Sequence, residues 1–133
     1  MQRAAEKGYG IIARMPLQFG LLSGNIKTDT VFSKDDHRSY RVVPPITEAV
    51  INILKQEVWP LCEKYKTTEA GLALSYILSY EEVSTVIPGI RTPEHVALNT
   101  DHIVQLDEAD KKRLQELYDT HWQPVMDMME KQG

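Results

Sequence analysis

Residues 84–99 constrain the fold of this chain most strongly, because they predict a buried strand, a sharp turn and the start of a helix. Residues 85–87 are a β-branched run, and Pro88 with Gly89 ends it. Thr92 at an N-cap position, followed by Pro93, indicates where the helix begins. Backbone N–H groups at such a helix start favour an anion above the end of the strand. Arg91 adds a permanent positive charge at this point.

A second strand is predicted at residues 11–13, after the tail of a helix at residues 2–7 that Gly8 ends. The short, continuous apolar run is typical of a parallel strand covered on both faces. Pro16 ends this strand, and residues 17–22 can form a brief helical turn.

The remaining chain is predicted to be mainly helical, after a long loop at residues 25–45. A helix is expected to start near Thr47 as its N-cap, with Pro60 causing a kink or a new helix after Trp59. The apolar residues spaced along its face are Val50, Ile51, Leu54, Val58, Leu61, Cys62 and Tyr65.

Two further helices have clear N-caps, at Thr68 and at Asp107. The second is expected to turn Leu114, Leu117 and Tyr118 inward. From Gln123 onward the alternatives are helix and disorder, with Met126, Met128 and Met129 interpreted as flexible surface methionines.

Composition describes an ordinary folded chain and excludes several classes of protein. Hydrophobic residues make up 42% and charged residues 26% of the sequence. The net charge of −4 argues against nucleic-acid binding, and no apolar run approaches the roughly 20 residues of a membrane span. A cytoplasmic location is therefore expected. The single cysteine, Cys62, excludes an internal disulfide and is interpreted as a packing residue.

Four segments together resemble the aldo-keto reductases, which are NADP(H)-dependent (β/α)8 barrels. Residues 10–24 resemble the seventh strand with its cofactor loop, residues 36–39 the segment after it, and residues 68–79 the helix before the eighth strand. The eighth strand and its helix carry the most specific motif, formed by Ile87, Pro88, Gly89, Thr92, Pro93 and Asn99. The resemblance implies an α/β fold that is the C-terminal part of a TIM barrel.

A complete barrel needs about 250 residues, whereas this chain has 133. We therefore expect residues 1–133 to be a single partial domain that lacks the first six strands. Two parallel strands would then have open edges, and helices would expose faces meant for neighbours. Three outcomes follow from this: self-association, rearrangement into a mainly helical unit, or a chain truncated from a longer gene product.

The family transfers a hydride between a nicotinamide and a carbonyl group, using a tyrosine, a lysine, an aspartate and a histidine from the first half of the barrel. No position here matches these four, so no catalytic residue is assigned and the chain alone is expected to be inactive. A small carbonyl substrate is expected only when the first half completes the site. His37, His102 and His121 lack the spacing of a metal site.

What the resemblance does imply is NADP(H) binding by ten residues. The nicotinamide is expected to contact Arg14 and Met15, and the pyrophosphate Pro16, Leu17, Gln18 and Phe19. The 2′-phosphate is expected to contact Gly89 and Arg91, and the adenine His95 and Asn99. Gly89, Leu98 and Asn25 depart from the usual family residues. Arg91 is expected to take over the phosphate contact, because its planar fork suits phosphate oxygens. The alternative for Arg14 and Arg91 is that both are solvated loop arginines.

Two other functions remain open. One is a noncatalytic half-barrel module that pairs with itself or with another chain, which makes a homo-oligomer possible. The other is a phosphate-binding isomerase fragment of the TIM-barrel type, which rests only on the phosphate preference of loops after strands seven and eight.

Overall fold

The computed structural model describes residues 1–132 and is α/β, with most of its ordered residues in helices. The elements in chain order are α1 (Gln2–Ala5), β1 (Ile11–Arg14), the 3₁₀ turn η1 (Gln18–Ser23), α2 (Arg38–Arg41), α3 (Pro44–Ile53), the π-helical turn η2 (Leu54–Val58), α4 (Pro60–Tyr65), α5 (Glu69–Leu78), β2 (Val83–Ile87), α6 (Pro93–Thr100), α7 (Glu108–Leu117), the π-helical turn η3 (Tyr118–Trp122) and α8 (Gln123–Lys131). No helix within residues 1–132 is long and apolar enough to cross a membrane.

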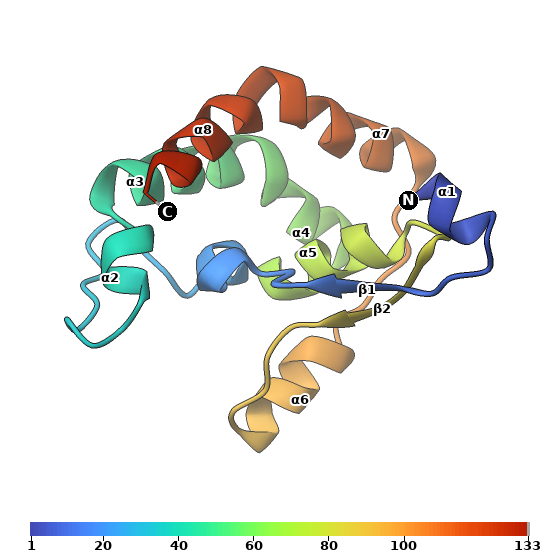
Figure 1. Ribbon diagram of the computed structural model, residues 1–133, viewed down its shortest axis with the longest axis horizontal. Coiled ribbons are helices and arrows are strands. Elements are labelled where there is room, and N and C mark those ends of the chain that lie inside the picture. Colours follow the sequence, from blue (N-terminus) through green and yellow to red (C-terminus); the bar gives the residue numbers. More distant parts are fainter. Residues whose placement is uncertain (133) are drawn as a thin grey trace.

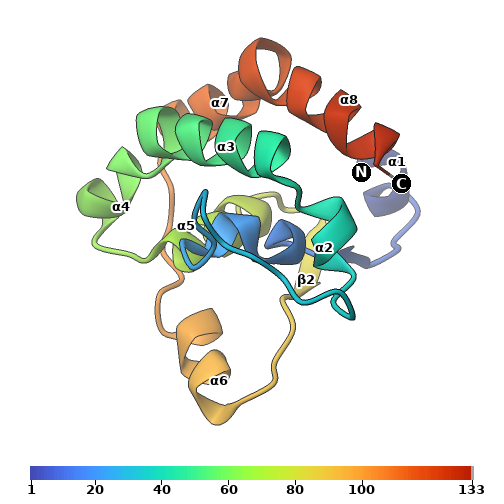
Figure 2. The same ribbon diagram turned by 90° about the vertical axis from the view of Figure 1, so that its left-hand side faces the viewer.

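The helices are stacked above a small sheet. Figure 1 shows α7, η3 and α8 as an arch over α3 and α4, with α5 beneath them and the strands below. Helix α6 lies on the far side of the strands from the arch (Figures 1 and 2). The arrangement therefore places most of the packing between helices and leaves the sheet near the surface.

Strands β1 and β2 pair in parallel, as the sequence predicted, with Arg14 opposite Ile87. The register slips between Ile11 and Ile12, where the Ile11 N–H donates to the Ser84 hydroxyl at 3.2 Å. The expectation of buried strands is wrong, because no residue of either strand is buried. Ile12 is 60% exposed and Ile87 51%. Burial on both faces needs covering layers on each side, and here α5 packs against β2, whereas α6 on the opposite side leaves the strand residues unburied.

The apolar core consists of two helical clusters instead. The first joins η1, α3 and α8 through Leu21, Ile26, Val42, Ile46, Val50, Ile51, Leu54 and Val125. The second joins α4, α5 and α7 through Leu61, Leu72, Leu106, Leu114 and Leu117. Trp122 and Val58 pack against both clusters. The helices thus bury their apolar faces against one another, and most of the apolar core lies outside the sheet.

Proline positions decide where two helices begin. The prediction of Thr47 as an N-cap is wrong, because α3 starts at Pro44 with Val43 as its N-cap. Proline is well tolerated in the first turn, where backbone N–H groups have no partners within the helix. Thr47 is buried inside this helix, and its hydroxyl donates to the Val43 carbonyl at 3.2 Å. The prediction of a new helix after Trp59 is confirmed, since α4 begins at Pro60 after the π-helical turn.

The side-chain caps predicted at Thr68 and Asp107 are confirmed, whereas Thr92 is the N-cap residue of α6 without a side-chain hydrogen bond to the helix. The Thr68 hydroxyl accepts from the Gly71 N–H at 3.0 Å, and the Asp107 carboxylate accepts from the Asp110 N–H at 2.8 Å. Tyr118, expected to point inward, is 53% exposed. It is the first residue of η3, and the wider π turn changes the side-chain periodicity that the prediction assumed.

The C-terminal segment is helical as far as Lys131, which settles one of the two alternatives for it. Met128 and Met129 are partly buried against the first cluster, so their interpretation as surface methionines is wrong. The hydrophobic stripe of α8 explains this, since Val125 is buried one turn before them.

The loop after β1 is held in an unusual backbone conformation. Met15, Gln18 and Phe19 have φ angles of +53°, +44° and +58°, although none is a glycine. For residues with a Cβ atom this region costs about 1–2 kcal/mol each. Three such residues within five positions indicate a loop whose shape is imposed by its surroundings.

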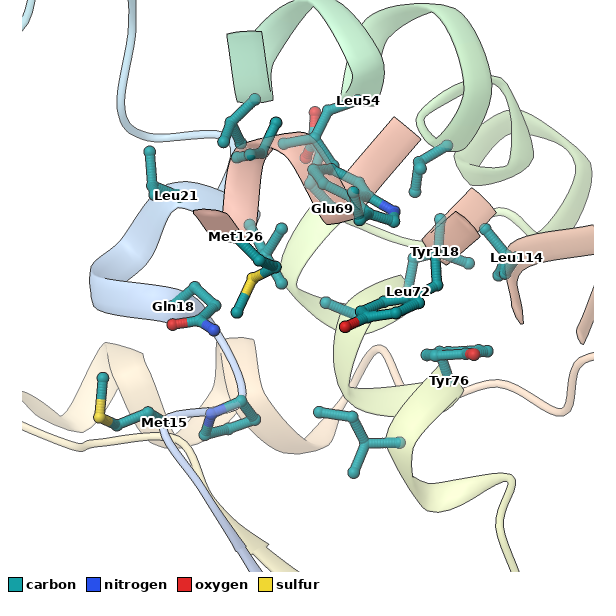
Figure 3. Close-up of a pocket in the computed structure, with 18 of the residues that line it drawn as sticks. Met15, Gln18, Leu21, Leu54, Glu69, Leu72, Tyr76, Leu114, Tyr118 and Met126 are labelled. Atoms are coloured by element: carbon teal, nitrogen blue, oxygen red, sulfur yellow. The ribbon is translucent and has the colours of Figure 1, made fainter. Parts of the chain in front are cut away.

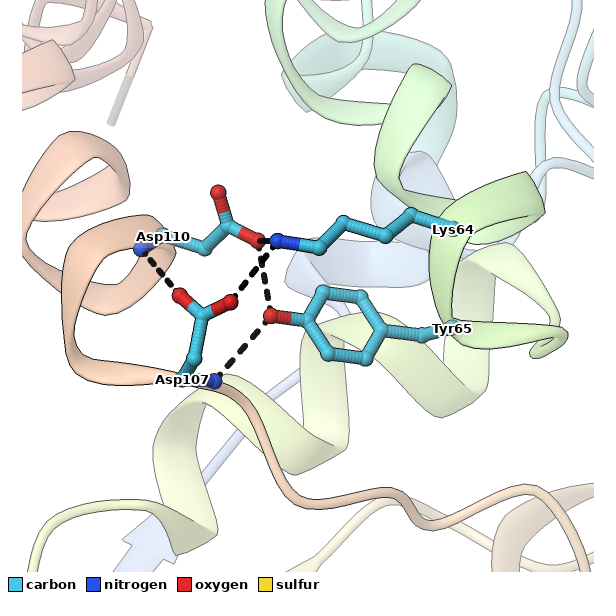
Figure 4. A network of polar contacts seen from close by, with 4 residues as sticks. All are labelled: Lys64, Tyr65, Asp107 and Asp110. Carbon is cyan, nitrogen blue, oxygen red and sulfur yellow. Dashed lines mark hydrogen bonds and ion pairs between the residues drawn. The ribbon is translucent and has the colours of Figure 1, made fainter.

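A polar network joins α4 to the start of α7 (Figure 4). The Lys64 ammonium donates to Asp107 at 2.7 Å and to Asp110 at 2.5 Å. The Tyr65 hydroxyl donates to Asp110 at 2.7 Å and accepts from the Asp107 N–H at 3.0 Å. Chiefly through the Lys64 hydrogen bond, the pKa of Asp107 falls to about 2. The network therefore fixes the arch to the helices below it.

We predict that this network makes stability depend on pH. The folded-state pKa of Asp107 lies below its ordinary value near 3.9. Its stabilisation is therefore present above about pH 4 and is lost as the pH falls toward 2. In urea unfolding followed by circular dichroism, the midpoint should fall more steeply over this range in the native chain than in Lys64→Met. Lys112→Met, which removes a long and exposed pair with Glu116, is the control. Equal slopes in the native chain and Lys64→Met would contradict the prediction.

A second prediction concerns the strained loop. Gln18→Gly removes a steric strain of about 1–2 kcal/mol from the folded state, where Gln18 has a positive φ. The glycine also lowers stability by about 0.5–1 kcal/mol, because it increases the conformational entropy of the unfolded chain. A net gain of about 0.5–1 kcal/mol in the free energy of unfolding is expected. Gln18→Ala keeps the strain and is the matched control, which should show no gain. A loss of stability in Gln18→Gly relative to Gln18→Ala would refute the idea that this residue is strained.

Candidate functional site

Two cavities lie on either side of the loop that follows β1. The larger, about 590 Å³, is called the arginine cavity. It is lined by Arg14, Met15, Leu17, Gln18, Phe19, Gly20, Ser23, Asn25, Ile26, His37, Arg38, Ala70, Ile87, Pro88, Gly89, Arg91, His95, Leu98 and Asn99. Its volume is that of an ordinary small-molecule site.

The arginine cavity brings together nine of the ten residues that the sequence assigned to the cofactor. They come from two segments about 70 residues apart, the loop after β1 and the segment from the end of β2 into α6. Pro16, the tenth, lies in the wall of the neighbouring cavity. The parallel pairing of β1 with β2 is what places the two segments side by side.

The segment after β2 is braced by its own hydrogen bonds. Gly89 has a φ of +84°, which suits a residue without a Cβ atom. The Asn99 side-chain amide donates to the Gly89 carbonyl at 3.3 Å, and the Arg91 N–H donates to His95 Nδ1 at 3.3 Å. His95 in the first turn of α6 and Asn99 in its last turn thereby hold the preceding turn against the helix.

His37 and Arg38, just before and at the start of α2, form another part of the wall. The His37 ring meets the edge of Phe19, with ring centroids 5.5 Å apart. The Asp36 carboxylate accepts from Arg38 Nε at 3.0 Å and from Nη2 at 2.5 Å. These bonds hold the pKa of Asp36 well below its usual range and raise that of Arg38.

The sequence did not assign His37 or Arg38 to the site, although residues 36–39 were part of the family resemblance. The available signal was an aspartate two residues before an arginine. The Arg38 N–H donates to the Asp36 carboxylate at 2.9 Å, which is the local turn that aspartate favours. A periodicity search does not detect such a turn.

The charge of the arginine cavity is one-sided. Arg14, Arg38 and Arg91 line it, and no aspartate or glutamate is among the lining residues that the structure describes. This occurs in a chain with a net charge of −4. A concave wall with several guanidinium groups and no carboxylate attracts anions, and above all those with several oxygens.

The second cavity, about 400 Å³, is called the apolar cavity (Figure 3). It lies between the loop after β1 and the helices α3, α5, α7 and α8. Its lining is Arg14, Met15, Pro16, Gln18, Leu21, Leu22, Val50, Leu54, Val58, Trp59, Glu69, Leu72, Ala73, Tyr76, Ile77, Leu114, Tyr118, Trp122, Val125, Met126 and Met129. Arg14, Met15 and Gln18 belong to both cavities.

Most residues that line the apolar cavity are apolar or aromatic, and Arg14, Gln18 and Glu69 are its charged and amide-bearing lining residues. The Tyr76 hydroxyl hydrogen-bonds to that of Tyr80 at 2.7 Å, and burial together with this bond raises the pKa of Tyr76. The indole N–H of Trp59 is buried without a hydrogen-bond partner among the described residues. Cys62, beside these helices, has a pKa of about 11 because burial disfavours its thiolate, which fits a packing residue.

Comparison with known proteins identifies the family to which the sequence is similar. The model of the aldo/keto reductase family matches residues 1–119. The NADH-specific methylglyoxal reductase of Escherichia coli (strain K12) is 31% identical over 112 residues, which are 81% of this chain and 34% of that enzyme. The chain thus spans about a third of the length of this curated relative.

The family match covers most of the chain and includes both segments that form the arginine cavity. It agrees with the resemblance read from the motifs after each strand. This chain belongs to the aldo/keto reductase family.

Proposed function

We propose that this chain is the cofactor-binding, C-terminal portion of a nicotinamide-dependent carbonyl oxidoreductase, with β1 and β2 as strands seven and eight of a TIM barrel. The observation that carries the proposal is the arginine cavity, which collects three guanidinium groups and no carboxylate among its described lining residues. A dinucleotide brings a pyrophosphate and a flat aromatic base at each end. The cavity offers hydrogen-bond donors for the pyrophosphate and apolar walls for the two aromatic rings.

Each part of the cavity suits one part of such a cofactor. The Arg14 guanidinium is planar and can lie against a nicotinamide ring. Residues 17–19 would contact the pyrophosphate, while Arg91, next to the first turn of α6, would contact a 2′-phosphate. His95 and Asn99 would border the adenine. NADP(H) is the form that the family motifs predict, whereas the relative from Escherichia coli is named as NADH-specific.

The cofactor, when bound, supplies the hydride that reduces a carbonyl carbon. The side chains of this chain would hold and orient the dinucleotide, and the adjoining apolar cavity would keep water from its surroundings. Proton donation to the carbonyl oxygen would require groups from the first half of a barrel. The chain alone is therefore proposed to bind cofactor without turning over substrate.

The proposal predicts a cofactor affinity that depends on Arg91. Isothermal titration of NADPH into the purified chain should give measurable binding, and Arg91→Gln should weaken it roughly tenfold or more, because a charge-assisted bond contributes about 1.5–3 kcal/mol. The affinity for NADH, which lacks the 2′-phosphate, should fall less in Arg91→Gln than the affinity for NADPH. Arg3→Gln, in α1 and away from the cavity lining, is the control. Binding that Arg91→Gln leaves unchanged would contradict the proposed site.

A second candidate, an association module, is favoured by the open sheet. Both strands have an unpaired edge within the described chain, since the sheet contains only β1 and β2. The exposed side chains of Ile12 and Ile87 add apolar surface there. Unpaired strand edges are templates for strands of another chain.

This candidate predicts a dimer in sedimentation equilibrium that Ile12→Lys dissociates, since a charge on a sheet opposes strand addition. Val31→Lys, on an exposed loop residue, is the control and should leave the dimer intact. A chain that stays monomeric at high concentration would exclude self-pairing.

A further inference from the structure

We propose that Asp36 is a positioning residue, which holds Arg38 in the wall of the arginine cavity and limits how strongly the cavity attracts phosphate charge. The inference rests on the proposed function, because it concerns the same cavity. It adds a residue that lies outside the cavity lining and acts on the ligand through Arg38.

The carboxylate of Asp36 accepts hydrogen bonds from both nitrogen atoms on one edge of the Arg38 guanidinium. Arg38 Nε and Nη2 both donate to the Asp36 carboxylate, and the backbone N–H of Arg38 adds a third donor. The guanidinium also lies over the Phe32 ring, 4.5 Å from its centroid. The two charged side chains are only 24% and 22% exposed, so Arg38 has little freedom to turn toward another anion.

The three arginines of the cavity therefore differ in effective charge. Arg14 and Arg91 make no ion pair within the described chain, whereas the charge of Arg38 is balanced by a carboxylate at hydrogen-bond distance. The pair still presents the N–H groups on the other edge of Arg38. A neutral pair can donate hydrogen bonds to phosphate oxygens, but it attracts each added phosphate charge less than a free guanidinium does.

The surroundings of the pair support this role. The His37 Nδ1 atom lies 3.8 Å from the Asp36 carboxylate, while its ring meets the edge of Phe19 on the cofactor loop. Arg41, one turn after Arg38, lies over the same Phe19 ring, with its guanidinium carbon 5.7 Å from the ring centroid. The segment holding Asp36 is thus seated on the loop that would contact the pyrophosphate.

The test replaces the carboxylate by its neutral, nearly isosteric amide. Inorganic pyrophosphate, NADPH and NADH are titrated calorimetrically into the native chain, Asp36→Asn, and the control Asp35→Asn, which changes the neighbouring exposed carboxylate. Asp36→Asn should bind pyrophosphate about three- to tenfold more tightly. NADPH and NADH, which share the pyrophosphate, should both bind more tightly to the same variant. Asp35→Asn should change none of these affinities more than about twofold.

A double variant tests whether the gain passes through Arg38. Asp36→Asn combined with Arg38→Gln should lose the tightening, whereas a general electrostatic effect of Asp36 would leave it. An unchanged pyrophosphate affinity in Asp36→Asn, or a gain that persists in the double variant, would overturn the inference. Failure of every variant to bind NADH and NADPH would overturn the proposed function, while the pyrophosphate titrations would still decide the role of Asp36.

Asp36→Ala keeps the inference testable if Asp36→Asn does not fold. This variant also removes the carboxylate, so pyrophosphate should bind about three- to tenfold more tightly than to the native chain. No gain in affinity would show that Asp36 does not limit Arg38. Thermal melting of each variant confirms that folded chains are being compared.

Discussion

The parallel pairing of β1 with β2 is the constraint on which the candidate site depends. Arg14 stands opposite Ile87, so both strands end at the same level. The chain leaves β1 into the strained loop and leaves β2 into the turn before α6, and the two exits therefore lie together. The arginine cavity is formed by this coincidence of strand ends, as ligand sites of parallel sheets generally are. One residue of slip in the register would separate the two walls.

Stability comes mainly from elsewhere. Neither strand has a buried residue, and both apolar clusters are formed between helices and η1. The site is thus carried by a sheet that contributes little apolar burial and is supported from one side by α5. Apolar burial in the helical clusters offsets the conformational entropy lost on folding. The residues at the strand ends can therefore be charged without a large loss of stability.

The sequence predicted those features whose cause is local. The caps at Thr68 and Asp107 and the helix break at Pro60 depend on side chains within a few residues, and all three are confirmed. Strand burial could not be predicted in this way, because it depends on neighbouring layers. For the site, the motifs selected residues that the fold brings together, whereas Arg38 was missed because its role depends on Asp36 and Phe32.

The apolar cavity has a consequence for spectroscopy. The chain contains two tryptophans, and both Trp59 and Trp122 line this cavity, whereas neither lines the arginine cavity. Intrinsic fluorescence will therefore report polarity and solvent access among the helices. A molecule in the arginine cavity can alter that emission only through the shared wall of Arg14, Met15 and Gln18, or through energy transfer across it. The fluorescence of Trp59 and Trp122 can therefore show whether a molecule in the arginine cavity changes the environment of the apolar cavity.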